Sequence, residues 1–414
     1  MNINTFVVKI ASRCNINCTY CYMYNLGDSS YKLQPKFIEK TTTINFVNKL
    51  LSHLQKSNTG TVFIILHGGE PLLMKKEDFE YFMDSFKILS ENNIRVVFAL
   101  QTNGILIDKE WIDIFRKYNI NIGVSLDGSE LVNDKFRIDK KGNGTYHKVI
   151  KGLEILKENN YSAGILSVMN LECDPVEYYE HFKNLSVPSL DVLLLDATHD
   201  NKETIFNNKM TPSDWYIKVF DEWFKDNNQK LQIRMFNVLI KSILGEDTGL
   251  DNLGILENKV LVLETNGDLE AVDVLKACGE SFTKNEININ TNEIDEVSKS
   301  TLIEVYYNSG KYLPRKCLAC PVQEICGGGY LPHRYSSVNG FNNPTIYCND
   351  LLKLITYIQN KVFDSMPLEL INETGISKLT YEEALELIEK NLPNIPIPEY
   401  TSKLEHFRNL QVTT

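Results

Sequence analysis

Short apolar β-type runs alternate with helical patterns from residue 5 to about residue 230 of this 414-residue chain. Strands are expected over residues 6–10, 61–66, 94–100, 120–126, 162–169 and 190–195. Between these runs, apolar residues recur at helical spacing, as at Phe79, Phe82, Met83 and Phe86. Such alternation predicts an α/β fold with a parallel sheet and crossover helices. Six strand–helix units predict an open, partial (β/α)6 barrel of the TIM type, because the closed form has about eight.

Two helices and a hairpin are expected at the end of this region and after it. One helix should begin at Thr211-Pro212 and bury Trp215, Val219, Trp223 and Phe224. A second helix is expected near 233–244. Residues 260–275 then predict a hairpin that turns at Asn266-Gly267.

The pattern divides the chain into three predicted parts. A barrel domain is expected at 1–230, a second domain at 231–350 and a helical extension at 351–414, which has a capping box at Thr380–Glu383. Most of the second domain shows little periodicity, so an apolar core alone is not expected to stabilise it. A metal site would provide the additional stability.

Composition restricts the class of protein. The hydrophobic fraction of 43% is that of a chain with a sizeable core. The formal net charge of −11, without a basic stripe, argues against a nucleic-acid binder. No window approaches the roughly 18 apolar residues of a membrane span, and the first residues do not resemble a secretion signal. We therefore expect a cytoplasmic protein without membrane or nucleic-acid partners.

Polar residues follow the first four predicted strands. The run His67–Pro71 follows the second strand, Gln101 and Asn103 follow the third, and Ser125 and Asp127 lie at the end of the fourth. Cysteines follow the first. Because parallel strands end at one edge of a sheet or barrel, these residues are expected to form a single site.

Seven of the nine cysteines fall into two groups, namely Cys14, Cys18 and Cys21, and Cys317, Cys320, Cys326 and Cys348. Clustered cysteines in a cytosolic chain are more often metal ligands than disulfides. Three thiolates of the first group suit three irons of a [4Fe–4S] cluster and leave the fourth iron open. The alternatives are a zinc site or three unrelated core cysteines. Cys173 is expected to be structural.

The spacing C-x3-C-x2-C, with Tyr20 before the last cysteine, resembles the radical S-adenosylmethionine (SAM) superfamily. In that superfamily the open iron is chelated by SAM, and one electron cleaves the cofactor to start radical chemistry. The run HGGEP resembles its glycine-rich motif, and SLDG with a later arginine resembles another. The resemblance, with the strand-end residues, implies cofactor contacts at Tyr20, Gly68, Gly69, Glu70, Gln101, Asn103, Ser125 and Arg137.

Four cysteines in the second group suit either zinc or a fully ligated second [4Fe–4S] cluster. They resemble the SPASM/twitch extension, which binds auxiliary clusters. Two positions depart from its full seven-cysteine pattern, because Val272 and Tyr330 stand where thiolates belong. We therefore predict two clusters in total. Cys278 is a stray candidate ligand or a free thiol.

Asp273 matches the position of a catalytic, proton-accepting aspartate in related sulfatase-maturing enzymes. The sequence around His333, Arg334 and Tyr335 resembles that of maturases which act on ribosomally made precursor peptides. These enzymes join an aromatic ring to a β-carbon of the peptide, which gives a cyclophane. The resemblance implies substrate contacts at those three residues and an external reductant of flavodoxin or ferredoxin type. Thioether formation, formylglycine formation in a sulfatase, and a non-enzymatic metal-binding role remain as alternatives.

Overall fold

The computed structural model describes residues 1–206, 208–226, 230–248, 250–367, 369 and 377–409. The chain divides into two compact units. Unit 1 is Met1–Val168, Val187–Leu193 and Lys259–Tyr307; unit 2 is Met169–Ser186, Leu194–Asn258 and Asn308–Thr414. The predicted boundaries at 230 and 350 stay a prediction. Parts of the predicted C-terminal extension, 368, 370–376 and 410–414, lie outside the described residues.

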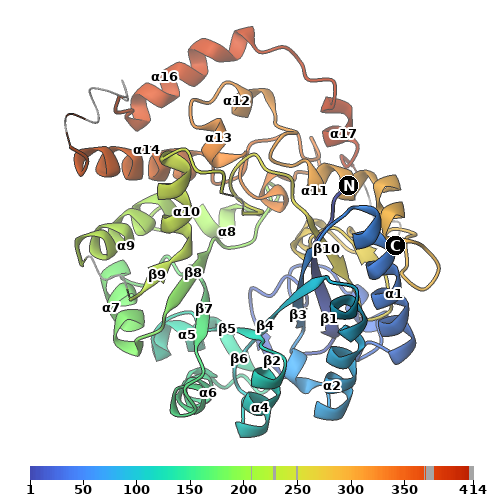
Figure 1. Ribbon diagram of the computed structural model, residues 1–414. Helices are drawn as coiled ribbons and strands as arrows, with labels where there is room; N and C mark the ends of the chain where they lie inside the picture. The colour runs from blue at the N-terminus through green and yellow to red at the C-terminus, as the bar shows by residue number, and fades with distance from the viewer. Residues whose placement is uncertain (207, 227–229, 249, 368, 370–376, 410–414) are drawn as a thin grey trace. The chain divides into compact units, whose positions relative to one another are not determined.

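A parallel sheet forms the centre of unit 1, as the alternating pattern predicted (Figure 1). Its predicted strands are β1 Thr5–Ala11, β3 Thr61–Gly68, β4 Arg95–Thr102, β5 Asn121–Ser125, β7 Ala163–Val168 and β8 Ser189–Leu193. These strands are adjacent in this order, and each neighbouring pair is parallel. The α/β fold with a parallel sheet is confirmed. Its curvature into a partial barrel stays a prediction.

Amphipathic helices cover this sheet, because each has one apolar face. The helices of unit 1 are α1 Lys40–Lys56, α2 Lys76–Ser85, α3 Lys87–Glu91, α4 Lys109–Lys117, α5 Glu130–Phe136, α6 Tyr146–Glu158 and α11 Thr301–Tyr307. Its 3-10 helices are η1 Ser30–Leu33, η2 Pro71–Leu73, η3 Asp273–Cys278 and η4 Ile294–Lys299. The predicted stripe of Phe79, Phe82, Met83 and Phe86 is buried, which confirms the helical interpretation there.

The predicted hairpin exists and has a second role. Strands β10 Val260–Leu263 and β11 Leu269–Glu270 pair in antiparallel fashion around Gly267, whose φ is 94°. The sequence pattern did not predict that β10 also pairs with β1, in parallel. The hairpin therefore extends the sheet and delivers η3, which begins with Asp273, to the side of β1.

A small second sheet joins the cysteine loop to the chain after β5. Strand β2 Ile16–Cys18 pairs with β6 Arg137–Asp139 in antiparallel fashion, and Cys18 lies opposite Arg137. Two residues that are 119 positions apart are thereby held side by side.

Unit 2 is mostly helical. Its elements are α7 Pro175–Leu185, α8 Glu203–Phe206, α9 Pro212–Asp226, β9 Gln232–Ile233, α10 Arg234–Ile243, α12 Arg315–Leu318, α13 Gln323–Cys326, η5 Leu331–Arg334, α14 Cys348–Asp364, α16 Tyr381–Asn391, η6 Leu392–Asn394 and α17 Thr401–Glu405. The capping box at Thr380 and Glu383 is confirmed at the start of α16.

Two predicted core residues of one helix are wrong. Helix α9 begins at Pro212 and buries Trp215 and Val219 as predicted, but Trp223 is only half-buried and Phe224 is 37% exposed. Phe220 is fully buried instead, with its ring 5.2 Å from that of Phe236 on α10. The helical period places both phenylalanines near the apolar face, and the partner helices decide which one is covered.

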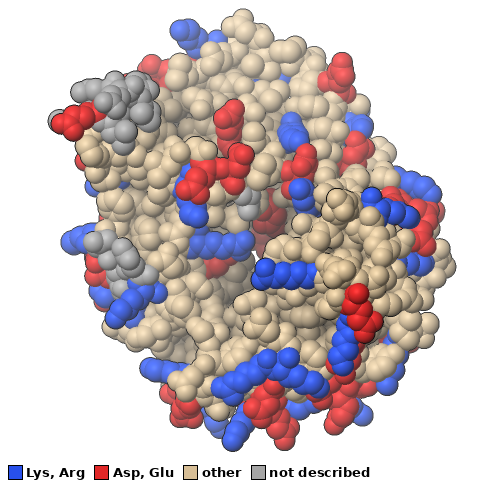
Figure 2. All heavy atoms as spheres, viewed as in Figure 1, with Lys and Arg blue, Asp and Glu red and all other residues tan. Residues whose placement is uncertain are grey.

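Surface features add two observations. On the face shown in Figure 2, Lys and Arg side chains lie among Asp and Glu side chains, so both signs of charge are mixed there. Among the described residues, no helix is both long and apolar enough to cross a membrane.

Gly68 and Gly69 allow the end of β3 to lie directly against the chain that leads into the cysteine loop. The N–H of Gly69 donates to Ala11 O at 2.8 Å, and the N–H of Glu70 donates to Arg13 O at 2.9 Å. A Cβ on Gly68 would overlap the carbonyl oxygen of Ala11, and its φ of 142° also favours glycine. These glycines therefore set the distance between the two strand ends.

We expect Gly68→Ala to lower the free energy of unfolding by roughly 2–5 kcal/mol, because the positive φ and the overlap both add cost. Gly27→Ala is the matched control, since Gly27 has a φ of 111° but nothing within 4 Å of its Cβ position. The control should lose only about 1–2 kcal/mol. Equal losses in chemical denaturation would contradict this account.

Candidate functional site

The first cysteine group follows the carboxyl end of β1 in unit 1. Cys18 ends β2 and is buried, while Cys14 and Cys21 are half-buried. Burial and the Glu70 carboxylate raise the pKa of Cys14 to about 12. Burial and the Cys18 thiol raise the pKa of Cys21 to about 12. Thiols with such pKa values stay protonated unless a cation pairs with them.

This environment fits a metal cluster, because iron ions supply the positive charge that stabilises buried thiolates. Each thiolate of a [4Fe–4S] cluster binds a different iron, so the sulfurs stand farther apart than the ligands of one ion. In the part of the chain that the structure describes, no three His, Cys, Asp or Glu side chains gather closely enough to hold a single ion.

Glu70 joins the ends of β3 and β4 to the cysteine loop. It is 1% exposed, and its Oε1 accepts hydrogen bonds from Leu72 N at 3.0 Å and Thr102 Oγ1 at 2.8 Å. Its Oε2 accepts from Asn103 N at 2.8 Å. Asn103 in turn donates through Nδ2 to Asn15 Oδ1 at 2.7 Å, beside Cys14. The Glu70 carboxylate therefore positions the loop through bonds to its own chain.

Tyr20, Asp127 and Arg137 form a buried chain of polar groups beside Cys18. Arg137 Nη1 donates to Tyr20 Oη at 2.8 Å, and Tyr20 Oη donates to Asp127 Oδ2 at 2.5 Å. Asp127 Oδ1 also accepts from Val168 N at 3.0 Å. Arg137 is 7% exposed, and its Nε is buried without a hydrogen-bond partner among the described residues. That donor can serve an oxygen of a bound cofactor.

Gln101 and Ser125 meet across the neighbouring strands β4 and β5. Gln101 Nε2 donates to Ser125 Oγ at 2.8 Å, and Gly123 leaves room for the Gln101 side chain. The structure thus brings together the predicted residues of four strand ends within unit 1, while their contacts with a cofactor stay a prediction.

Asp273 lies in a second buried polar cluster of unit 1, with Lys9, His67 and Tyr22. The Lys9 ammonium on β1 is paired with the Asp273 carboxylate and lies 2.9 Å from His67 Nδ1. Tyr22 Oη donates to Asp273 Oδ2 at 2.8 Å. Burial alone would raise the pKa of Asp273, but the Lys9 charge and the hydrogen bonds hold it well below its usual range. Burial and Lys9 lower the pKa of His67 to about 3.

A buried ion cluster anchors η3 and therefore Asp273. Lys276 Nζ lies 2.9 Å from Glu264 Oε1 and 3.2 Å from Glu270 Oε2, and none of the three side chains is more than 2% exposed. Burial opposes the charge of Lys276, yet the two carboxylates raise its pKa well above its usual range. The hairpin and the 3-10 helix are thus held together by charge.

The sequence did not indicate roles for Lys9 or Tyr22, and His67 and Asp127 were noted only as members of the strand-end site. Lys9 carried a usable signal, because it is a charged residue inside the otherwise apolar run of residues 6–10. It is fully buried. A buried lysine needs an anionic partner, but the sequence could not say that the partner is Asp273.

The four cysteines of the second group lie together in unit 2. Cys317, Cys320, Cys326 and Cys348 line one small cavity, together with Lys316, Val322, Gly328, Thr345, Leu352 and Ile388. Burial and the neighbouring thiols raise the pKa of Cys317 to about 12. The set offers four thiolates to a metal cluster, in which each cysteine binds a different iron. Cys173 and Cys278 are not among the residues that line this cavity.

Three consecutive glycines shape this site. Gly327, Gly328 and Gly329 have φ values of 60°, 78° and 71°, a run that residues with side chains would rarely adopt. A Cβ on Gly327 would overlap the Gly254 carbonyl, and one on Gly329 would lie 2.8 Å from Thr345 Cγ2. The turn leads directly from Cys326 into η5.

The predicted substrate residues of η5 and its end are buried against their own unit. His333 Nε2 lies 3.1 Å from Asp196 Oδ1, and its ring is 5.2 Å from that of Tyr347. Arg334 donates to two backbone carbonyls and Tyr335 packs against Phe341. His333, Arg334 and Tyr335 are at most 4% exposed. Their contact with a substrate stays a prediction.

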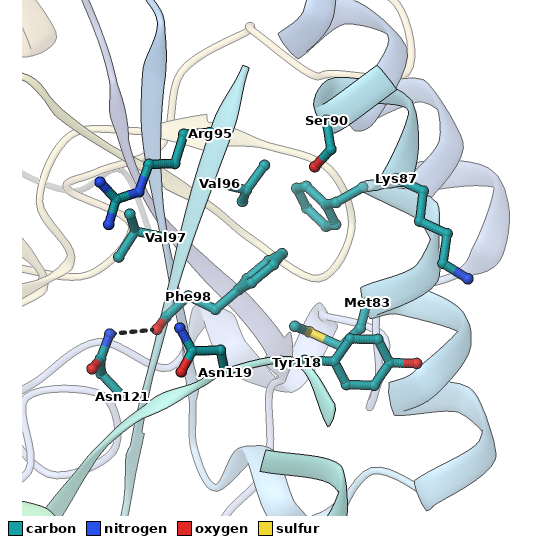
Figure 3. A pocket seen from close by; sticks show the side chains of 11 residues that line it. Met83, Lys87, Ser90, Arg95, Val96, Val97, Phe98, Tyr118, Asn119 and Asn121 are labelled. Carbon is teal, nitrogen blue, oxygen red and sulfur yellow. Dashed lines mark hydrogen bonds between the residues drawn. The ribbon is translucent and has the colours of Figure 1, made fainter. Parts of the chain in front are cut away.

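Figure 3 shows a separate cavity of unit 1, about 380 Å³ in volume, between β4 and the helices α2 and α3. Arg95, which begins β4, and Asn121, which begins β5, both line it. It therefore lies at the amino ends of these strands, whereas the cysteine loop lies at the carboxyl ends.

The Lys9–Asp273 pair yields a stability prediction. Asp273→Asn or Lys9→Met alone should lower the free energy of unfolding by roughly 3–5 kcal/mol, because each leaves a buried charge without its partner. The double variant should lose less than the sum of the two, with a coupling of at least about 1 kcal/mol in denaturation measurements.

The matched control is the exposed pair Lys40–Asp78, whose side chains are 63% and 51% exposed. Its cycle of Lys40→Met and Asp78→Asn should couple by less than about 1 kcal/mol. Additive losses at Lys9 and Asp273 would contradict a buried ion pair.

Comparison with known proteins agrees with this geometry. The sequence model of the Radical SAM superfamily matches residues 8–186. A cysteine-type anaerobic sulfatase-maturating enzyme of Clostridium novyi is 24% identical over 391 residues, which are 92% of this chain and 97% of that protein. The radical SAM cyclopropyl synthase TigE of Paramaledivibacter caminithermalis is 28% identical over 203 residues, 46% of this chain and 41% of that protein.

A solved structure supports the fold. Native anSMEcpe with bound AdoMet has a TM-score of 0.74 at 22% identity, and the match covers 87% of this chain and 100% of that chain. A radical SAM domain implies SAM and a [4Fe–4S] cluster as cofactors. The chain therefore contains a radical SAM domain at residues 8–186 and is a radical SAM enzyme.

Proposed function

We propose that this enzyme modifies a ribosomally made precursor peptide by joining an aromatic ring to the β-carbon of a nearby residue, which gives a cyclophane. Cys14, Cys18 and Cys21 would hold the cluster that, with bound SAM, supplies a 5′-deoxyadenosyl radical for removal of a β-hydrogen. Cys317, Cys320, Cys326 and Cys348 would hold an auxiliary cluster able to take up one electron. The peptide loses two hydrogens, one as an atom and one as a proton with its electron. An external flavodoxin or ferredoxin is the expected reductant.

The single observation behind this choice is the set of four cysteines that line one cavity in unit 2. They make a complete ligand set for one auxiliary cluster. Val272 and Tyr330 stand where the full seven-cysteine pattern has further thiolates. A chain with one auxiliary cluster matches the cyclophane-type pattern better than the full pattern of sulfatase-maturing enzymes.

Asp273 is the proposed proton acceptor. Its pairing with Lys9 keeps the carboxylate ionised, so it can take a proton, although the same charge makes it a weak base. A weak base suffices here, because an aromatic ring that has gained a carbon substituent and lost an electron is a strong acid. The hydrogen bond from Tyr22, the residue after Cys21, ties this carboxylate to the cysteine loop.

The cofactor contacts are proposed for the strand ends of unit 1. The buried Arg137 Nε provides a donor for the carboxylate or ribose of SAM, and Tyr20 and Ser125 are proposed to contact the same cofactor. Gln101 holds Ser125, and Asn103 holds the cysteine loop. Gly68, Gly69 and Glu70 complete the proposed set by bringing the end of β3 against that loop.

A second candidate is oxidation of a Ser or Cys to formylglycine in a sulfatase. The similarity to a sulfatase-maturating enzyme, which extends over 92% of this chain, favours it. Enzymes of one fold can nevertheless act on different substrates, so an identity of 24% leaves the choice to experiment.

The cluster content can be predicted. After anaerobic reconstitution, the wild-type protein should bind about eight irons, four in each cluster. Replacing Cys14, Cys18 and Cys21 by Ala should leave about four irons and abolish 5′-deoxyadenosine formation. Replacing the four cysteines of unit 2 should also leave about four irons, but deoxyadenosine should still form. Cys173→Ala is the control and should keep both clusters. Bound zinc without deoxyadenosine would overturn the proposal.

The reaction can be tested with short synthetic peptides that contain aromatic residues but neither Ser nor Cys. A cyclophane product should lose two hydrogens, resist a hydrazide reagent and give no fragments between the joined residues in tandem mass spectrometry. Asp273→Asn should still form deoxyadenosine but give at least about tenfold less product, since it lacks the proton acceptor.

A sulfatase-derived peptide with Ser or Cys is the control. If only this peptide reacts, and its product is labelled by the hydrazide, the formylglycine candidate replaces the cyclophane proposal.

A further inference from the structure

Arg334 is a buried cation in unit 2 that has no acidic partner among the described residues. It is 0% exposed, and its Nη1 and Nη2 donate to the carbonyls of Ser309 at 2.8 Å and Tyr312 at 2.7 Å. Its Nε is buried without a hydrogen-bond partner among the described residues. No carboxylate of the described chain forms an ion pair with it. A guanidinium in such a place needs a negative charge nearby, because desolvation of an unpaired charge is costly.

The groups around Arg334 that can carry a negative charge are mainly thiols of the second cysteine group. Burial lowers the pKa of Arg334 to about 10, and among the described residues the Cys317 and Cys326 thiols and the Tyr400 hydroxyl oppose this. Gly328 lines the cavity of the four cysteines, and its Cβ position is 3.0 Å from Arg334 Nη1. The missing side chain of Gly328 thus lets the guanidinium lie against the cysteine turn.

We propose that Arg334 is the counter-charge of the four-cysteine site and that its guanidinium stabilises the thiolates of Cys317 and Cys326 when a metal centre is bound. The inference rests on the proposed auxiliary cluster and deepens it. A reduced cluster carries one more negative charge than an oxidised one, so a fixed positive charge beside it favours the reduced form and raises the reduction potential. An electron acceptor benefits from such a shift.

Lys316 is the natural comparison, because it is a second cation that lines the same cavity. It is only half-buried, so water and salt screen its charge more than that of Arg334. Removing its charge should therefore disturb a cluster less than removing the charge of Arg334.

The test uses the full-length chain with Cys14, Cys18 and Cys21 replaced by Ala, so that only the four-cysteine site can hold a cluster. Into this background we introduce Arg334→Gln, Arg334→Lys and Lys316→Gln, and we measure the iron content and the midpoint potential by EPR-monitored titration. Arg334→Gln should shift the midpoint to a clearly more negative potential than Lys316→Gln does. Arg334→Lys, which keeps the charge, should stay near the parent.

A midpoint of Arg334→Gln equal to that of the parent or of Lys316→Gln would overturn the proposal. If the Arg334→Gln variant cannot hold the cluster, the Arg334→Lys variant tests the proposal instead. A cluster that Arg334→Lys retains, with a midpoint near that of the parent, supports a role for the charge. Loss of the cluster in both variants shows that the carbonyl contacts matter and overturns it.

Failure of the proposed function has a different outcome. A parent that binds zinc instead of iron removes the auxiliary cluster, and the counter-charge is then tested by competition for zinc with a chelator. Arg334→Gln should release zinc more readily than Lys316→Gln. Equal release of zinc from the two variants would contradict the counter-charge proposal as well.

Discussion

Parallel pairing of β1 with β3 on one side and with β10 on the other determines which side chains can meet in unit 1. The carboxyl end of β1 leads into the cysteine loop, and the end of β3 brings Gly68 and Glu70 against it. The hairpin that starts with β10 carries Asp273 back to Lys9. Because parallel strands end at one edge, three distant segments of the chain contribute to one place. The glycines at the end of β3 make the approach close enough for backbone hydrogen bonds.

Buried charge is the second organising feature. Two buried lysines have acidic partners inside the protein. Lys9 is paired with Asp273, and Lys276 lies between Glu264 and Glu270. Arg137 and Arg334 differ, because each keeps a buried Nε without a partner among the described residues. Both arginines lie beside cysteine groups. Each cysteine group therefore has beside it a buried arginine with an unused donor, which a bound cluster or cofactor could accept from.

The two cysteine groups are built by different means. The first group lies on a loop held by strand ends and by Glu70, so its geometry depends on the sheet. The second group is gathered by short helices and by three glycines with positive φ, which let Cys326 turn back toward Cys317 and Cys348. Such a segment has little apolar periodicity, and a bound metal centre would add the stability that a core otherwise gives. The proposed auxiliary cluster would in this way hold its own segment together.

The sequence by itself determined the strands and helices of the parallel sheet, because period and apolar pattern are local properties. It also determined the two cysteine groups, because ligand spacing is visible along the chain. It misassigned Phe224 in place of Phe220, since the helices packed against α9 decide which ring is covered. Only the tertiary structure decided that β10 extends the sheet, that Lys9 pairs with Asp273 and that Arg334 faces the second cysteine group. Each of these depends on contacts between residues far apart in sequence, and no local pattern encodes the partner of a buried charge.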